Sequence, residues 1–347
     1  MSHIIFKTTL STVIVASLLS ACSAIEPKAT NTNLVTTSDN LYKPDTHPAG
    51  LPTSPNEMRV TLLGTGSPVP SVSRYSMSTL VQANGYNFVF DAGRGNVIRL
   101  TQAGVPLGKI DGVFLTHYHS DHVNGLSDLW MTGYIPAFGG RAGGLEVYGP
   151  KGVNALVEGL KMAHADDIRV RVADKEIKDE STTDIRANEF DTNSVVFNKN
   201  GVKITSFDVE HDHNGAIQPA VGFRIDYAGH SVLLSGDTTP TPNVIKYGKD
   251  VDLLIHEVAD FEDINALPQV YAHHTNPRQA SNIFNQTRPK MAVYSHIVDG
   301  GSSKKLTPIS DDEFIKRTRE NYSGPLVMGK DLMSFSITSK GVEVYRY

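Results

Sequence analysis

The sequence predicts an α/β fold in which two β-sheets pack together with helices on the outside. Short apolar runs closed by glycine, such as "RVTLLG" and "NFVFDAG", recur along the chain, and each is typical of a buried strand. Some of these predicted strands follow one another directly, and others alternate with amphipathic segments of helical period. Both arrangements are expected for two sheets covered by helices. The hydrophobic fraction of 39% and charged fraction of 20% are those of a globular protein.

The predicted elements follow one another from residue 59 to the end of the chain. Strands are expected at 59–64, 87–93, 112–117, 145–150, 202–210, 220–229, 230–237, 251–258 and 290–297, with a closing hairpin of 332–338 and 342–347 around Lys340-Gly341. Helices are expected at 96–104, 120–130, 153–164, 243–248, 276–287 and 311–321. Ser120 is the predicted cap of the second helix, and Pro277 lies in the first turn of the fifth. The charged, poorly periodic segment 163–200 is expected to be a surface arm within one domain.

The N-terminus has the features of an export signal. Lys7 precedes an apolar stretch, residues 10–19, which is too short to span a bilayer but fits a secretory signal. Leu19-Ser20-Ala21-Cys22 then resembles a bacterial lipobox, with an ordinary cleavage site as the alternative. We therefore expect a lipoprotein-type signal peptide over 1–22, a lipidated Cys22 as membrane anchor, and a location in the cell envelope, either lipid-anchored or periplasmic or secreted.

Composition separates a tether from a folded domain. Residues 23–57 are rich in Thr, Asn, Ser and Pro and have no period, which predicts a flexible linker before a domain at 58–347. Cys22 is the only cysteine, so the chain has no intrachain disulfide framework and no cysteine-rich zinc finger. The formal net charge of −5 gives no electrostatic reason to expect nucleic acid as a partner.

Histidines and an aspartate cluster after the strand at 112–117. In "THYHSDH", His117 and His119 lie two residues apart at a strand end and point the same way, so both can reach one cation. Asp121 and His122 lie past the turn and can face a second cation. A histidine-rich surface loop is the alternative interpretation. Imidazole and carboxylate ligands suit Zn²⁺, with Mn²⁺ and Fe²⁺ as alternatives.

Further candidate ligands also follow predicted strands. Asp237 comes after "SVLLSG", where Gly236 permits a turn that aims the carboxylate at cations, and His296 ends "KMAVYSHI". An aspartate in such a place is otherwise a turn former.

The motifs "LLGTGSP", "FDAGRG", "LTHYHSDH", "LLSGDT", "LLIHE", "HHTNPRQA" and "AVYSHI" together resemble the metallo-β-lactamase superfamily over most of residues 59–347. They are most similar to the branch of transfer-RNA 3′-processing endonucleases, phosphodiesterases and bacterial arylsulfatases. The resemblance implies a four-layer αββα sandwich with two divalent metal ions at one edge of both sheets.

The resemblance also implies roles for individual residues. His117, His119 and a histidine after the strand at 202–210 would bind the first metal, with His211 favoured over His213. Asp121, His122 and His296 would bind the second metal, and Asp237 would bridge the two. The catalytic residues implied are Asp121, His274, which contacts the scissile group, and Glu257, which orients His274. Remaining expectations are His273 as the alternative to His274, Asp91 in a supporting role, a structural His256, and surface positions for His164 and His230.

The function implied is that of an exported dinuclear-metal hydrolase that cleaves sulfate-ester or phosphodiester bonds. A β-lactamase or lactonase of the same fold and an inactive, membrane-anchored zinc-binding protein are the alternatives. We expect a small-molecule ester substrate and no nucleic acid, because export and the missing Gly/Pro-rich basic arm in 163–200 argue against transfer RNA. The oligomeric state is left open between monomer and homodimer.

Overall fold

The computed structural model describes residues 47–212, 217–263, 268–300 and 307–346. The predicted signal peptide of 1–22, with Cys22, lies outside these ranges and stays a prediction, and His213 lies outside them too. Within the described ranges, no helix is long and apolar enough to cross a membrane.

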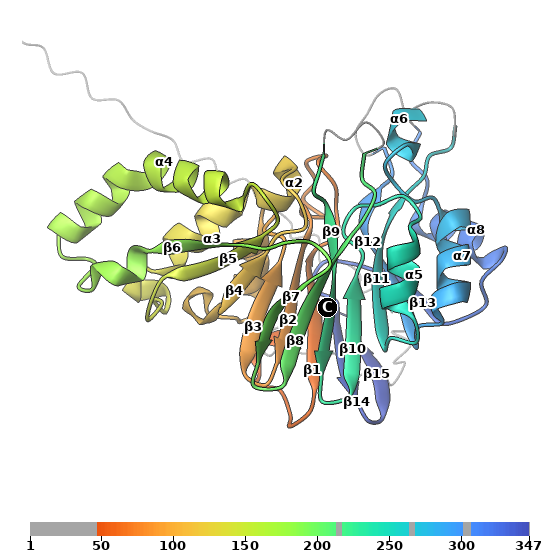
Figure 1. Cartoon of the computed structure of the whole chain (residues 1–347), viewed down its shortest axis with the longest axis horizontal. Helices are drawn as coiled ribbons and strands as arrows, with labels where there is room; N and C mark the ends of the chain where they lie inside the picture. The colour runs from red at the N-terminus through yellow and green to blue at the C-terminus, as the bar shows by residue number, and fades with distance from the viewer. Residues whose placement is uncertain (1–46, 213–216, 264–267, 301–306, 347) are drawn as a thin grey trace, which may run out of the picture. The chain divides into compact units, whose positions relative to one another are not determined.

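Two mixed β-sheets form the centre of the described domain (Figure 1). The eight-stranded sheet has the order β15-β14-β1-β2-β3-β4-β5-β6, and the seven-stranded sheet has the order β13-β12-β11-β10-β9-β8-β7. The first contains β1 (Met58–Gly64), β2 (Ser78–Ala83), β3 (Tyr86–Phe90), β4 (Gly112–Phe114), β5 (Leu145–Gly149), β6 (Ile185–Glu189), β14 (Ser334–Thr338) and β15 (Gly341–Tyr345). The second contains β7 (Val195–Lys199), β8 (Val202–Asp208), β9 (Val221–Tyr227), β10 (His230–Leu234), β11 (Leu253–Ala259), β12 (Met291–Val298) and β13 (Leu326–Met328).

Helices cover the outer face of each sheet, which confirms the predicted αββα sandwich (Figure 1). They are α1 (Asn96–Gln102), α2 (Ser120–Val123), α3 (Leu126–Gly133), α4 (Val153–Ala173), α5 (Pro242–Gly248), α6 (Pro268–Tyr271), α7 (Pro277–Thr287) and α8 (Asp311–Arg319). Three clusters of buried apolar side chains fill the three interfaces between the four layers. Phe90 and Phe223 lie between the sheets, Trp130 of α3 packs on the first sheet, and Phe284 of α7 packs on the second.

Burial on both faces explains why the strands have continuous apolar runs. All seven residues of β1 and of β11 are buried, as expected for strands between two layers. The pairs β3–β4 and β10–β11–β12 are parallel, so their carboxyl ends meet at one edge of each sheet. The candidate ligands other than His211 come from segments at or just past such ends, and His211 follows β8, which is antiparallel to its neighbours.

The predicted helix at 120–130 is two helices. α2 begins at Ser120 with His119 as its N-cap residue and no side-chain cap, so the expected cap at Ser120 is wrong. The helix is interrupted at Gly125, whose N–H donates to Ala92 O at 2.7 Å. A Cβ at Gly125 would lie 2.3 Å from Gly93 O, so only glycine allows this approach. The break therefore docks the histidine-bearing turn against the end of β3.

The segment 163–200 is not a separate arm. Helix α4 continues to Ala173, and its second half carries the ion pairs Arg169–Asp166 and Arg171–Asp167. Val153 and Val157 of this helix are buried, and Leu156 and Leu160 pack beside them, but after residue 164, where the predicted helix ended, only Ile168 and Val172 pack on the core. After it, β6 and β7 each add an edge strand to a sheet.

Residues 47–57, which the sequence analysis assigned to the linker, pack on the domain. His47 Nε2 lies 2.7 Å from Leu332 O, and Ala49 is 3% exposed. Arg59 donates to Leu51 O at 2.7 Å and to the Glu57 carboxylate at 3.0 Å. These contacts place the start of the described domain before residue 58.

Candidate metal centre

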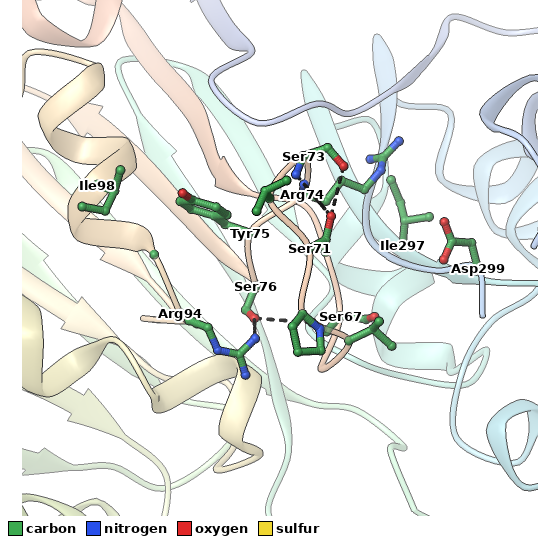
Figure 2. A pocket seen from close by; sticks show the side chains of 15 residues that line it. Ser67, Ser71, Ser73, Arg74, Tyr75, Ser76, Arg94, Ile98, Ile297 and Asp299 are labelled. Atoms are coloured by element: carbon green, nitrogen blue, oxygen red, sulfur yellow. Dashed lines mark hydrogen bonds between the residues drawn. The ribbon is translucent and has the colours of Figure 1, made fainter. Parts of the chain in front are cut away.

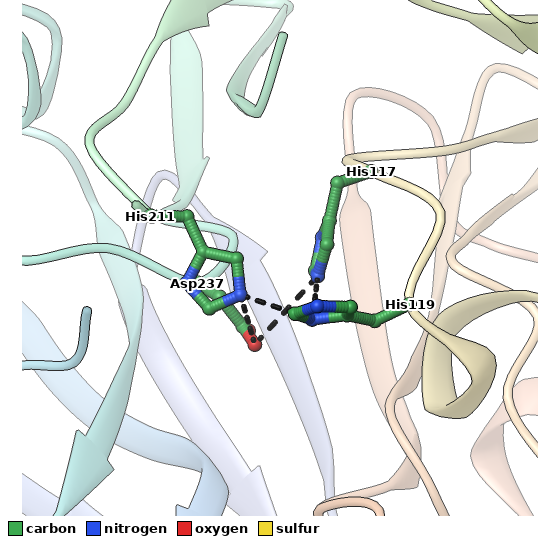
Figure 3. Close-up of side chains that lie close together, drawn as sticks. All are labelled: His117, His119, His211 and Asp237. Atoms are coloured by element: carbon green, nitrogen blue, oxygen red, sulfur yellow. Dashed lines mark hydrogen bonds and ion pairs between the residues drawn. The ribbon is translucent and has the colours of Figure 1, made fainter. Parts of the chain in front are cut away.

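Three imidazoles and a carboxylate converge in a first group made of His117, His119, His211 and Asp237 (Figure 3). Their ligand atoms all lie within 4.8 Å of one another. His119 Nδ1 is 3.0 Å from His117 Nε2 and 3.1 Å from His211 Nε2. Asp237 Oδ2 is 3.7 Å from His211 Nε2 and 4.0 Å from His117 Nε2.

A second group, Asp121, His122 and His296, lies next to the first, and Asp237 of the first group is close to two of its imidazoles. His296 Nε2 is 3.1 Å from both Asp121 Oδ2 and Asp237 Oδ2. His122 Nε2 is 3.6 Å from Asp121 Oδ2 and 3.4 Å from Asp237 Oδ2. The Asp237 carboxylate thus stands between the two groups, where a bridging ligand has to be.

The donor set fits a pair of divalent cations. Ligand atoms about 2.0–2.1 Å from one tetrahedral Zn²⁺ stand about 3.4 Å apart, close to the spacings measured here. Asp121 Oδ1, His122 Nε2 and Asp237 Oδ1 are buried and have no hydrogen-bond partner among the described residues. Buried polar atoms are normally paired, so three orphaned atoms in one cluster of side chains need an explanation. Cations in both groups would provide one.

Burial keeps the first-group imidazoles in the form that binds metal. It holds the pKa of His117 well below 6.5 and lowers the pKa of His211 to about 3, so both are neutral at pH 7. Burial alone would raise the pKa of Asp237, but His296 and His122 outweigh it and hold that pKa well below 3.8. Burial also lowers the pKa of His122, yet Asp237 and Asp91 raise it well above 6.5, so His122 would release a proton on binding a cation.

Hydrogen bonds behind the ligands fix their orientation. His122 Nδ1 donates to Asp91 Oδ2 at 2.8 Å, which leaves Nε2 facing the second group. Asp91 is held in turn by the N–H of Thr116 at 2.8 Å and by its hydroxyl. His211 Nδ1 donates to His273 O at 3.0 Å, so its Nε2 faces the first group. The expected supporting role of Asp91 agrees with this geometry, whereas Thr116 and the His273 carbonyl were not predicted.

Two ligand-bearing turns depend on special backbone geometry. Gly236 has φ +62°, and a Cβ there would lie 2.5 Å from Val221 O, so the turn before Asp237 requires glycine. His296 has φ +44° and is skipped in the pairing of β11 with β12, where Glu257 faces Ser295 and Val258 faces Ile297. This bulge re-aims the His296 ring toward the centre.

A histidine–carboxylate pair lies beside the two groups. His274 Nδ1 is 3.2 Å from Glu257 Oε1, and the same oxygen accepts the N–H groups of Thr238 and Thr275 at 3.0 Å each. The His274 ring also has a ligand atom within 4.8 Å of Asp237 and His296. Burial lowers the pKa of His274 to about 4, so its imidazole is neutral at pH 7.

The predictions for the remaining histidines agree with the structure at His256 and need correction at His164 and His230. His256 is fully buried on β11 with Nδ1 2.7 Å from Glu257 O, in keeping with a structural role. His164 and His230 are partly exposed, but the expectation that they have no partners is wrong. The His164 ring packs edge-on to Trp130 at 5.9 Å, and His230 Nδ1 lies 3.8 Å from Asp252 Oδ2.

Comparisons with known proteins place this geometry in a family. A family model described as "Beta-lactamase superfamily domain" matches residues 86–297. Ribonuclease Z of Mycolicibacterium gilvum is 32% identical over 282 residues, which cover 79% of this chain and 94% of the relative. Ribonuclease Z of Mycobacterium bovis is 31% identical over 281 residues, which cover 79% of this chain and 96% of the relative.

Solved structures share the fold at low sequence identity. The metallo-beta-lactamase fold protein YhfI from Bacillus subtilis has a TM-score of 0.64 and 21% identity, with 81% of this chain and 99% of that chain covered. The short form of human tRNase Z has a TM-score of 0.58 and 22% identity, with 80% of this chain and 98% of that chain covered.

These findings overturn the expected partners. A small-molecule ester and no nucleic acid were expected, but the relatives that match 79% of this chain are named ribonuclease Z. The expectation relied on net charge, on a predicted export signal and on the missing Gly/Pro-rich basic arm in 163–200, none of which reports on the bond that the site cleaves. Fold, family match and the His/Asp groups agree that the chain is a member of the metallo-β-lactamase superfamily of metal-dependent hydrolases.

Proposed function

We propose that this protein is a dinuclear-metal phosphodiesterase that cleaves RNA. The observation that carries the proposal is the buried His274–Glu257 pair, 3.2 Å apart, directly beside the shared carboxylate Asp237. A histidine held by a carboxylate is suited to moving a proton at an ester oxygen. The relatives named ribonuclease Z support RNA as the source of the phosphodiester.

The metals would be held by His117, His119 and His211 in one site, by Asp121, His122 and His296 in the other, and by Asp237 between them. Histidine and carboxylate donors without thiolate favour Zn²⁺ over softer ions, with Mn²⁺ and Fe²⁺ as alternatives. Such a pair of cations lowers the pKa of water toward 7 and neutralises charge that develops on a phosphodiester.

The chain's own residues supply the proton transfer and the positioning. Neutral His274 keeps its proton on Nδ1, where Glu257 Oε1 accepts it, so Nε2 is the basic nitrogen. Nε2 can take up a proton released by the attacking water and return it to the leaving ribose oxygen. Glu257 stabilises the imidazolium in between and is fixed by the N–H groups of Thr238 and Thr275. Asp121, whose Oδ2 lies 3.1 Å from His296 Nε2, would help to hold the second cation.

Location remains a separate proposal. The lipobox-like end of residues 1–22 supports export and lipidation at Cys22. Neither property changes the bond that the centre would cleave.

The test uses the purified full chain, loaded with Zn²⁺, on a 3′-extended transfer-RNA precursor, an unstructured oligoribonucleotide, p-nitrophenyl sulfate, a cephalosporin and an acyl lactone. We expect RNA cleavage that leaves defined ends and falls at least about 100-fold in His274→Gln. The matched control is His230→Gln, at the opposite end of β10 from Asp237, which should retain wild-type activity. Turnover of the sulfate, cephalosporin or lactone without RNA cleavage would contradict the proposal.

A further inference from the structure

We propose that a pocket beside the metal centre is a nucleotide subsite, in which Arg94 binds a phosphate next to the scissile one. The proposal rests on the proposed RNA-cleaving function and adds to it a residue that determines substrate preference. The pocket has a volume of about 750 Å³ and is bounded by the loop 66–76, by Arg94, Gly95 and Ile98, and by Ile297 and Asp299 (Figure 2).

The pocket shares its walls with the segments that carry the centre. Ile297 directly follows the candidate ligand His296, and its N–H donates to Thr65 O at 2.8 Å. Arg94 lies three residues after Asp91, and Gly93 between them donates to Met77 O at 3.0 Å. A chain bound across the centre can therefore place its neighbouring nucleotide in this pocket.

Arg94 is the arginine of this region whose charge is not neutralised. Arg74 is bound to both carboxylate oxygens of Asp311 at 2.6 Å, and Arg99 pairs with Asp331 at 2.9 Å. Arg94 is exposed, and within the described ranges its guanidinium makes one long hydrogen bond, 3.5 Å to Ser76 Oγ, and no ion pair. A free guanidinium fork at the mouth of a pocket matches a phosphate group in charge and geometry.

The rest of the wall suits a flat base. The Tyr75 ring is held by the Arg99 guanidinium, 4.1 Å from its centroid. Gly95 lies so close to the ring that a Cβ there would be 2.2 Å from Tyr75 Cδ2, and Ile98 leaves 49% of its surface exposed. Ile98 and the part of Tyr75 that stays exposed offer an apolar surface against which a base can pack. Asp299, the one carboxylate residue among the described lining residues, lies on the opposite side of the pocket from Arg94 in Figure 2.

The experiment compares two substrates in the full, Zn²⁺-loaded protein. An oligoribonucleotide carries phosphates on both sides of the scissile bond, whereas bis(p-nitrophenyl) phosphate carries only the scissile one. The variants are Arg94→Gln, Arg94→Lys and the control Arg169→Gln, which removes an exposed charge from α4. We expect Arg94→Gln to raise the KM for RNA about 10- to 100-fold more than the KM for the small diester, which is the loss typical of a charged hydrogen bond. Arg94→Lys should recover part of this, and Arg169→Gln should change neither KM.

An equal KM change on both substrates, or no change on either, would overturn the subsite and leave the proposed function standing. If the wild-type protein cleaves the small diester but not RNA, the proposed function fails instead. The subsite is then tested by fluorescence anisotropy of a labelled oligoribonucleotide, and equal affinity of wild-type and Arg94→Gln protein would overturn it.

Discussion

Asp91→Asn removes the charge that orients a metal ligand and leaves the shape of the site in place. Asp91 has φ +56°, a conformation that asparagine tolerates. Its carboxylate accepts the His122 Nδ1–H at 2.8 Å and the Thr116 N–H at 2.8 Å. An asparagine oxygen can replace one of these acceptors at best, and it carries no charge. The His122 ring then loses both its anchor and part of its basicity.

The size of the effect follows from burial and from the type of bond. Asp91 is 1% exposed and His122 is fully buried, so solvent does not screen this hydrogen bond. A hydrogen bond to a charged group contributes about 1.5–3 kcal/mol, and loss of such a partner behind a metal ligand lowers metal affinity about 10- to 100-fold. The loss should fall on the cation held by Asp121, His122 and His296, and only weakly on the other.

Competition between the protein and a chromophoric chelator measures the two affinities separately. We expect Asp91→Asn to keep one affinity near the wild-type value and to weaken the other about 10- to 100-fold. The control is Asp111→Asn, which loses a bond to the Asn87 N–H before the amino end of β4 and should bind metal as the wild type does. Two unchanged affinities in the Asp91→Asn protein would refute the reasoning.

Three more results are expected. Glu57→Gln should destabilise the fold by about 1.5–3 kcal/mol at pH 7. Burial would raise the pKa of Glu57, but the hydrogen bonds that its carboxylate accepts and the Arg59 guanidinium hold that pKa below 4.5. The stabilisation by the ionised carboxylate is therefore present above pH 4.5 and is lost as pH falls through the lowered pKa. Equal urea midpoints of wild type and variant at pH 7 would contradict this prediction. Gly236→Ala should lower the thermal midpoint more than Gly229→Ala, because both positions have positive φ but only Gly236 has a backbone oxygen in the way; equal midpoint shifts would contradict this. Dialysis against a chelator should abolish RNA cleavage and lower the thermal midpoint, since the buried carboxylates lose their counter-charge. Added Zn²⁺ should restore both the cleavage and the thermal midpoint. Cleavage that survives chelation would rule out a metal-dependent reaction.

The candidate ligands were predictable because each lies at or just after an apolar strand. The carboxyl ends of the parallel strands β10 and β12 meet at one edge of the second sheet, which brings Asp237 and His296 together. His117 follows β4 of the other sheet, and only the resemblance implied that it joins them. The turn at Gly236 was predicted because glycine permits it, and its positive φ agrees with that.

Contacts between residues far apart in the sequence were not predictable. Strand β2 was missed because Ser78, Thr79 and Gln82 make it look polar, and each is nevertheless buried. Ser78 donates to Asp91 O and Gln82 to Ala49 O, partners that no local pattern reveals. The first half of helix α4 was predicted, whereas its second half and the edge strands after it were missed because their solvent-facing surfaces carry little apolar period.

Metal content is the most direct test of a two-cation centre bridged by Asp237. We expect elemental analysis of the wild-type protein to give two divalent cations per chain. Asp237→Ala should lower that number and cut RNA cleavage at least about 100-fold while the far-ultraviolet circular dichroism stays unchanged. An Asp237→Ala protein with full metal content and full rate would contradict the account.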